Sequence, residues 1–157
     1  MSDLTQVGGV LRFTVYGKAV SQGSKRVIPV KTKDDGVRHC IIEQTDKALR
    51  LWRSDVVAAA RAAYTGGVML GAFRLALTFY RTRPQSHYGT GKHAGQLRDS
   101  APRYPTTRHD TIKDARAIED ALTGVLWRDD SQICEHLIRK IFGECLRVDV
   151  EVQVLDS

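Results

Sequence analysis

Three segments of the chain alternate apolar with polar side chains, which is the pattern of a β-strand that buries one face. They lie at residues 11–16, 72–81 and 146–154, and in the last one valines recur at every second position from Val148 to Val154. Long strands with one polar face predict a sheet that is partly antiparallel or mixed. We therefore expect a mixed α/β (α+β) fold.

Two helices are expected between these strands. Thr45 can cap the first, which runs to about residue 64 and is ended by Gly66-Gly67. Its apolar stripe at helical spacing is Ala48, Trp52, Val56, Ala59 and Ala63. The second runs from about residue 111 to 122 and is closed by Thr123-Gly124. Its apolar side is Ala115, Ile118, Leu122 and Val125, and both tryptophans, Trp52 and Trp127, are interpreted as core.

Short extended segments are predicted at about residues 26–31, 37–43 and 131–142, the first two separated by a turn at residues 33–36. A length of 157 residues is that of one domain with a real core, and the sequence shows no internal repeat. The prediction is a single domain over residues 1–157, with one mixed sheet and two main helices.

A basic loop is predicted at residues 82–108, which are rich in Pro, Gly, Ser, His, Arg and Lys and show no period. With Tyr88 and Tyr104 it offers side chains that contact DNA phosphates without reading sequence. The candidates there are Arg81, Arg83, Lys92, Arg98, Arg103 and Arg108, followed by Lys113 and, more weakly, by Lys18, Lys25 and Arg26 of the glycine-punctuated loop after the first strand. The alternative is a solvated, flexible loop.

Composition narrows the class of protein. The formal charge of +6 and the isoelectric point near 9.4 favour a polyanionic partner, although ribosomal and membrane-surface proteins share this bias. The cysteines, Cys40, Cys134 and Cys145, have no metal-site spacing and are expected to be reduced, partly buried thiols. Neither a membrane span nor a signal peptide is visible, so a cytoplasmic protein is expected.

Carboxylates concentrate at two points, Asp110/Asp114 and Asp129/Asp130, on either side of the second predicted helix. A helix of that length followed by a turn can fold the second pair back towards the first. Clustered carboxylates suit hard cations such as Mg²⁺. The competing interpretations are ordinary: Asp110 as a helix cap and Asp129-Asp130 as a polar turn.

The segment from Asp110 through Arg116 and Asp120-Ala-Leu-Thr-Gly to Asp129-Asp130-Ser-Gln-Ile resembles the core motif of the RusA-type Holliday junction resolvases. The resemblance is specific over residues 120–133 and extends back to about residue 102, and residues 13–18 are similar to the family's opening strand and glycine turn. It implies a dimeric, Mg²⁺-dependent (Mn²⁺ is the other option) endodeoxyribonuclease of the type frequent in phages and prophages. Cleavage of branched DNA would then leave a 5′-phosphate.

Carried over by position, Asp110 and Asp130 match metal-binding catalytic residues, and Arg116 matches the basic residue that contacts the scissile phosphate. The chain departs from the motif at Ile112, where the family has a second aspartate, and at His109, where proline is usual. Two carboxylates, Asp114 and Asp129, are candidates to supply the missing oxygen ligand.

Three functions follow from these features. The first is a structure-selective endonuclease that resolves branched DNA as a homodimer. The second is a junction-binding protein whose catalysis is weakened or lost, because an alkyl side chain such as that of Ile112 cannot coordinate Mg²⁺. The third, a basic RNA-binding domain, explains the charge but not the carboxylates.

Overall fold

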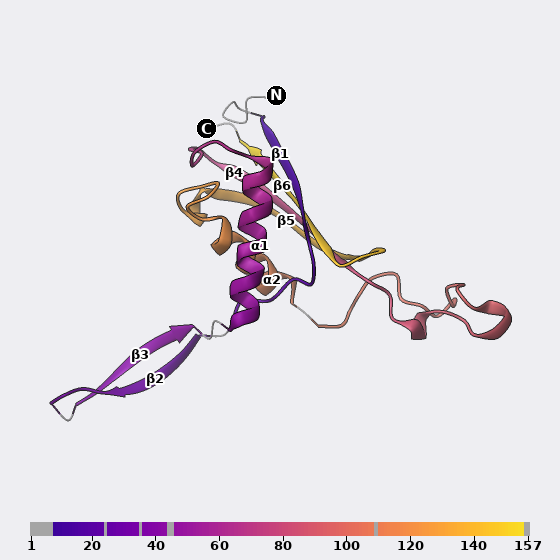
Figure 1. The fold of residues 1–157 in the computed structure, drawn as a ribbon, viewed down its shortest axis with the longest axis horizontal. Helices are drawn as coiled ribbons and strands as arrows, with labels where there is room; N and C mark the ends of the chain where they lie inside the picture. The colour runs from indigo at the N-terminus through magenta and orange to yellow at the C-terminus, as the bar shows by residue number, and fades with distance from the viewer. Residues whose placement is uncertain (1–7, 24, 35, 44–45, 109, 156–157) are drawn as a thin grey trace.

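The computed structural model describes residues 8–23, 25–34, 36–43, 46–108 and 110–155 (Figure 1). Its strands are β1 (Val10–Tyr16), β2 (Lys25–Lys31), β3 (Val37–Glu43), β4 (Phe73–Arg81), β5 (Ile133–Phe142) and β6 (Arg147–Val154). Its helices are α1 (Lys47–Ala63) and α2 (Thr111–Leu122), with short 3₁₀ turns η1 (Gln85–His87), η2 (Gly91–His93) and η3 (Asp130–Gln132). The mixed α+β class predicted from the sequence is confirmed.

Four strands form the main sheet in the order β1-β6-β4-β5. β6 is antiparallel to both of its neighbours, whereas β4 and β5 are parallel, so the sheet is mixed as expected. β2 and β3 pair only with each other, as an antiparallel hairpin. Figure 1 shows this hairpin and the loop of residues 82–108 projecting from different sides of the body that the sheet and helices form.

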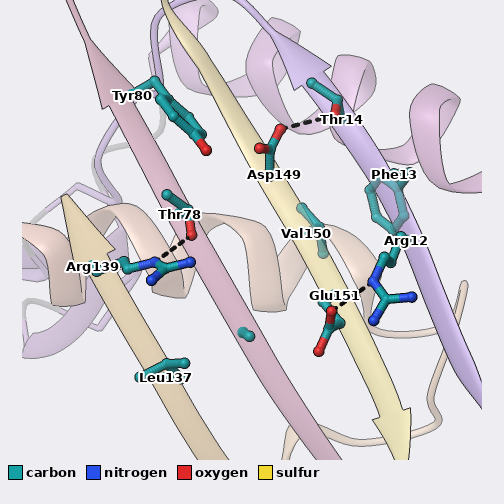
Figure 2. A pocket seen from close by; sticks show the side chains of 11 residues that line it. Arg12, Phe13, Thr14, Thr78, Tyr80, Leu137, Arg139, Asp149, Val150 and Glu151 are labelled. Atoms are coloured by element: carbon teal, nitrogen blue, oxygen red, sulfur yellow. Dashed lines mark hydrogen bonds and ion pairs between the residues drawn. The ribbon is translucent and has the colours of Figure 1, made fainter. Parts of the chain in front are cut away.

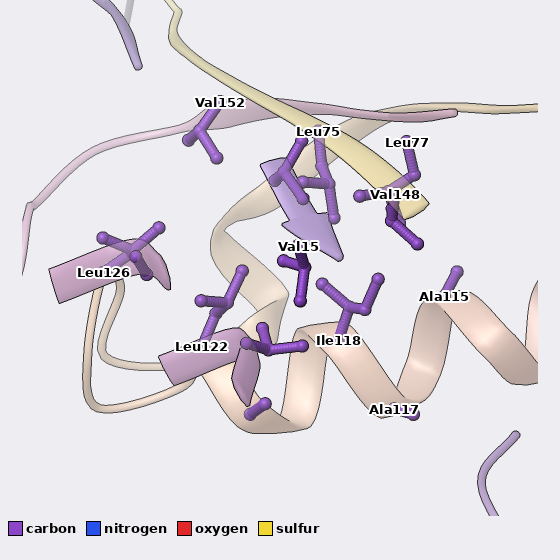
Figure 3. Packing of buried hydrophobic residues seen from close by; sticks show 14 of the residues in the cluster. Val15, Leu75, Leu77, Ala115, Ala117, Ile118, Leu122, Leu126, Val148 and Val152 are labelled. Atoms are coloured by element: carbon purple, nitrogen blue, oxygen red, sulfur yellow. The ribbon is translucent and has the colours of Figure 1, made fainter. Parts of the chain in front are cut away.

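The core lies between one face of the sheet and the two helices (Figure 3). The predicted alternation holds in β4 and β6, where every second side chain from Phe73 to Phe79 and from Val148 to Val154 is buried, and in β4 Thr78 of the opposite face is buried as well. Ile118 and Leu122 of α2 pack onto these valines and leucines. Both tryptophans belong to this core as predicted, with Trp52 3% and Trp127 0% exposed.

The opposite face of the sheet is polar, and its side chains pair across the strands (Figure 2). The Arg12 guanidinium contacts Glu151 at 2.7 Å, and the Thr14 hydroxyl donates to Asp149 at 2.9 Å. Arg139 donates to the Thr78 hydroxyl at 2.9 Å. A shallow cavity of about 490 Å³ lies over these pairs.

The parallel pair β4 and β5 is joined through α2, and this connection decides where the acidic segment lies. Parallel neighbours need a crossover, because the chain must return to the start of the first strand before the second begins. α2 therefore runs antiparallel to the strands. Its N-terminal turn lies at the ends of β4 and β5, where Lys140 donates to the Thr107 carbonyl at 2.8 Å. Its C-terminal turn lies at their beginnings, where Trp127 packs on Phe73 at a centroid distance of 6.2 Å.

Three details of the sequence prediction need correction. α1 is capped by Asp46, which accepts from the Leu49 amide at 2.8 Å, and it ends at Ala63; Thr45 lies outside the described residues. The stripe that α1 buries is Leu49, Trp52, Val56 and Ala60, so the helix faces the core along a line that includes the predicted Trp52 and Val56 and leaves Ala48 and Ala63 exposed. Cys134 and Cys145 are exposed free thiols, and the Cys40 side chain lies outside the description.

Candidate functional site

The N-terminus of α2 carries the first candidate carboxylate. Asp110 is the N-cap of the helix, and its Oδ1 accepts a hydrogen bond from the Ile112 amide at 3.0 Å. The helix-cap interpretation is thus confirmed, and the exposed side chain keeps contact with solvent. Ile112 itself is 59% exposed, so the alkyl side chain that replaces the expected aspartate does not pack in the core.

One turn further on, Asp114 is fully buried, at 0% exposure. Its Oδ1 accepts from the Ser21 hydroxyl at 2.5 Å, and its Oδ2 accepts from Nη2 of Arg81, at the end of β4, at 3.1 Å. The backbone N–H of Gln22 also donates to the Lys113 carbonyl at 3.1 Å. These contacts join the loop after β1, the end of β4 and the first turn of α2. Because a buried charge must be paired, Asp114 and Arg81 hold each other in place.

The other carboxylate pair lies beyond the C-terminal end of α2. Asp129 caps η3, accepting from the Ser131 amide at 2.9 Å, and the hydroxyl and amide of Ser131 together lower the pKa of Asp129. The Gln132 side chain accepts from the Asp129 amide at 3.1 Å and donates to the Gly71 carbonyl at 3.0 Å, which ties η3 to the segment before β4. Asp129 and Asp130 are exposed, and the polar-turn interpretation is confirmed as their local structure.

Near this second pair, the carboxylate of Glu119 in α2 accepts a hydrogen bond from Nε2 of His136 in β5 at 2.9 Å. Partial burial raises the pKa of Glu119, the nearby His136 opposes this rise, and the charges of Asp130 and Asp120 add to it. Asp130 is therefore a neighbour of the C-terminal half of α2.

The two carboxylate pairs do not come together within one chain. Glu119, whose pKa is influenced by Asp130, lies nine positions after Asp110, which corresponds to about 13.5 Å along a helix. Asp130 precedes Ile133, which pairs with the first residue of β4, whereas Asp114 contacts the last residue of β4. Ligands of one Mg²⁺ lie at about 2.1 Å from the ion, so Asp110 and Asp130 of the same chain cannot share it.

The expectation that the turn after α2 folds the second pair back towards the first is therefore wrong. The turn does reverse the chain, with the Gly124 amide donating to the Trp127 carbonyl at 2.7 Å. The turn leads to the start of β5, however, and β5 begins beside the start of β4 because the two strands are parallel. Among the residues that the structure describes, no group of three His, Cys, Asp or Glu side chains is arranged to hold a metal ion.

The predicted DNA-contacting residues fall into two groups. Three arginines are engaged within the protein: Arg81 with Asp114, Arg83 with the Pro102 carbonyl at 2.9 Å, and Arg98 with the Tyr88 carbonyl at 2.8 Å. The others have exposed side chains, namely Lys18, Lys92, Arg103, Arg108, Lys113 and Arg116. The side chains of Lys25 and Arg26, and all of His109, lie outside the described part of the chain.

Sequence reasoning missed two interactions at these ends. Ser21, in the loop after β1, carries no local signal that it meets Asp114, which is 93 positions away. The pairing of Glu119 with His136 joins a helix to a strand, and only the parallel arrangement of β4 and β5 places them together. Both interactions could have been found only from the crossover that joins the parallel strands β4 and β5 through α2.

Exposed carboxylates therefore lie at both ends of α2, and the first of them follows the basic loop of residues 82–108. Comparison with known proteins names the class. Residues 25–153 match the family described as endodeoxyribonuclease RusA, so the chain belongs to this family of nucleases that act on Holliday junctions. The match begins after β1, so the similarity of residues 13–18 lies outside it.

A relative is the uncharacterized protein YqaN of Bacillus subtilis (strain 168), which is 26% identical over 148 residues, covering 94% of this chain and 98% of the relative. No helix within the described residues has the length and apolar character needed to cross a membrane.

Proposed function

We propose that this protein is a divalent-metal-dependent endonuclease that cuts branched DNA as a homodimer, with each metal site built from two copies of the chain. The observation that carries the proposal is the placement of Asp110 and Asp130 at opposite ends of α2. Both carboxylates are exposed, and their match to the family motif implies that both bind metal. A second copy supplies the carboxylate that the first cannot bring within reach.

Twofold symmetry makes this arrangement self-consistent. If Asp110 of one copy meets Asp130 of its partner, the same operation brings Asp130 of the first copy to Asp110 of the partner. The dimer then holds two equivalent sites, separated by roughly the length of α2. A four-way junction likewise presents two strands in related positions. A divalent ion such as Mg²⁺, with Mn²⁺ as the substitute, would polarise the scissile phosphate and activate water.

The ligand that replaces the aspartate expected at Ile112 is, in this proposal, Asp129 rather than Asp114. Asp129 is exposed, and its lowered pKa keeps it ionised at neutral pH. Asp114 is buried with both oxygens already engaged, so a metal there would have to displace Arg81. Lys113 and Arg116, exposed on α2, are positioned to contact phosphates flanking the site at Asp110.

A second candidate function is a junction-binding protein without catalysis. Ile112 favours it, because one carboxylate of the family motif is absent and the exposed alkyl group offers no oxygen in its place. The two functions share the fold and the basic surface. They differ only in whether the carboxylates of two copies complete a site.

Subunit complementation tests the proposal. Asp110→Asn and Asp130→Asn are expected to fold and to be inactive as homodimers, because each substitution damages both sites. A mixed dimer, isolated through two different affinity tags, would contain one site with both substitutions and one intact site. It should nick a synthetic four-way junction in Mg²⁺ or Mn²⁺ on one strand only.

The matched control pairs Asp110→Asn with a chain that carries both substitutions, because that mixed dimer has no intact site and should stay inactive. An inactive Asp110→Asn/Asp130→Asn mixed dimer beside an active parent would place each site within one chain. A parent protein that binds junctions but cuts in neither metal would establish the binding-only function. If the Asp130→Asn protein still cuts at the parental rate, Asp130 has only a structural role in its turn.

A further inference from the structure

A second cavity, of about 440 Å³, lies where the loop of residues 82–108 leaves the sheet. Its lining comes from the ends of β4 and β5, from the first and last parts of the loop, and from Lys18 and Leu146. It belongs to neither carboxylate pair. Thr107 lines it, and Asp110 follows Thr107 by three residues, so the cavity adjoins the N-terminal end of α2.

One side of this cavity is apolar and held in a fixed shape. Phe142 lines it together with three prolines, Pro84, Pro102 and Pro105. The Arg83 guanidinium lies 4.1 Å from the centroid of the Phe142 ring, and His87 meets the same ring edge-on at 5.5 Å. Because Arg83 also donates to the Pro102 carbonyl, one planar cation fixes the ring and the proline wall together.

Polar and positively charged residues also line the cavity. Lys18 is exposed there, and the hydroxyl-bearing residues Thr106 and Thr107 line it. The charge of Arg81 is balanced by Asp114, but its buried Nε has no hydrogen-bond partner among the described residues. The cavity thus combines apolar residues, hydrogen-bonding groups and one exposed lysine.

This combination fits one nucleotide. Pockets of a few hundred Å³ with apolar walls and a few placed polar groups bind small ligands, and nucleic-acid bases stack on aromatic and planar cationic side chains. Lys18 suits the phosphate, and the threonine hydroxyls suit the edge of a base. We propose that this cavity takes up one unstacked nucleotide of branched DNA, next to the phosphate at Asp110.

The proposal rests on the proposed function only for the source of the nucleotide. A base inside a continuous duplex must be unstacked and unpaired before it can occupy a pocket, and this cost is smallest where pairing is already disturbed. The cavity would therefore favour DNA with a branch point over a regular duplex. It gives the protein a way to select structure without reading sequence.

The experiment uses the Asp130→Asn protein without divalent metal, so that binding is measured apart from cleavage. The probe is a four-way junction that carries 2-aminopurine, an adenine analogue that brightens when unstacked, at successive positions near the branch. Protein should brighten the probe at one or two positions and leave it dark in the matched duplex. Brightening at no position by protein that binds the junction would overturn the proposal.

Two variants assign the brightening to this cavity. Phe142→Leu keeps an apolar side chain but removes the ring, and Arg83→Lys keeps the charge but removes the planar group that fixes the ring. Both should lose the brightening and weaken junction binding about tenfold, the scale of one lost stacked base. Arg61→Lys, on an exposed position of α1, is the matched control and should retain the brightening.

Brightening that persists in both Phe142→Leu and Arg83→Lys would place the unstacked base elsewhere. Thermal unfolding of each variant separates loss of the cavity from loss of the fold, and Lys18→Ala, an exposed change, tests the charged side independently. A free deoxynucleoside monophosphate that competes as well as the junction would make this a site for soluble nucleotides. Equal brightening with single-stranded RNA would overturn the assignment to branched DNA. Complementation of Asp110→Asn with Asp130→Asn reports on the nuclease separately.

Discussion

The two ends of α2 carry the same kind of side chain in opposite environments. In the first turn, Asp114 is completely buried and is held by Ser21 and Arg81. Beyond the last turn, Asp129 and Asp130 are exposed on a 3₁₀ turn. A buried, paired carboxylate is committed to the fold, whereas an exposed one can take a ligand. The acidic segment therefore contains a structural carboxylate, Asp114, and carboxylates that are open to a ligand. At the first end of α2, Asp110 is exposed in the same way as Asp129 and Asp130 at the second end.

The largest effect expected from this contrast is on stability. Asp114→Ala should lower the free energy of unfolding by about 3–5 kcal/mol, because it leaves the Arg81 guanidinium buried without its counter-charge. Asp130→Ala, at an exposed position, should change it by less than about 0.5 kcal/mol. Urea unfolding at one fixed protein concentration measures both.

A double variant sharpens this result. Asp114→Ala combined with Arg81→Met should recover most of the loss, since an apolar replacement of both partners removes the unpaired charge. If Asp114→Ala instead unfolds like the parent and loses only its metal dependence, Asp114 is a metal ligand and the contrast between the two ends fails.

A smaller effect separates the two roles of Asp110. Asp110→Ala should lose about 1 kcal/mol with the helix cap, whereas Asp110→Asn keeps a capping oxygen and should lose only a few tenths. Cleavage should be lost in both. Asp110→Asn should bind a junction at least as tightly as the parent, because it removes a negative charge near phosphate, and both should lose affinity steeply with salt. Fluorescence anisotropy across a salt titration checks this, and flat binding would contradict it.

Much of the fold was predictable because it depends on local periodicity. The alternation in β4 and β6 fixes which side chains face the core, and the apolar spacing of Ile118 and Leu122 fixes the buried side of α2. The caps were less predictable, because Asp46 and Thr45 are adjacent and both residue types are common at helix N-caps. Asp46 has the cap because its side chain reaches the Leu49 amide.

The sequence motif points to candidate residues for the site, but it does not give the distances between them. The motif identified Asp110 and Asp130, yet spacing alone allowed them to meet. Asp110 and Asp130 lie apart because β4 and β5 are parallel, and the sequence of a strand does not show whether it pairs in parallel or antiparallel. A β-strand, helix and β-strand crossover always puts the residues before and after the helix at opposite ends of the strands. The contact of Ser21 with Asp114 depends on the same long-range arrangement.

A modest effect is expected from Ile112→Asp at the first end of α2. The position is 59% exposed in the first helical turn, where a negative charge is favourable by about 0.3–1 kcal/mol, so the variant should be slightly more stable than the parent. It should also raise cleavage or lower the metal concentration that cleavage requires. In the proposed dimer this gain should survive Asp129→Ala, because the new carboxylate supplies the missing oxygen. A protein inactive before and after the change, but still binding junctions, would favour the binding-only function.

The smallest expected effect lies at the second end, in the dependence of stability on pH. Burial, with the charges of Asp130 and Asp120, raises the pKa of Glu119 above its ordinary 4.5, against the opposing effect of His136. The stability that this group contributes is fully present below pH 4.5 and is lost as the pH rises through the higher folded-state pKa. Glu119→Gln should therefore gain stability relative to the parent between pH 4 and pH 7. Asp130→Asn removes one of the repelling charges, so the same substitution in that background should gain less. Urea unfolding of the parent, Glu119→Gln, Asp130→Asn and the double variant at pH 4 and pH 7 measures this. If Glu119→Gln loses stability relative to the parent as the pH rises, pairing of Glu119 with His136 outweighs the effect of burial.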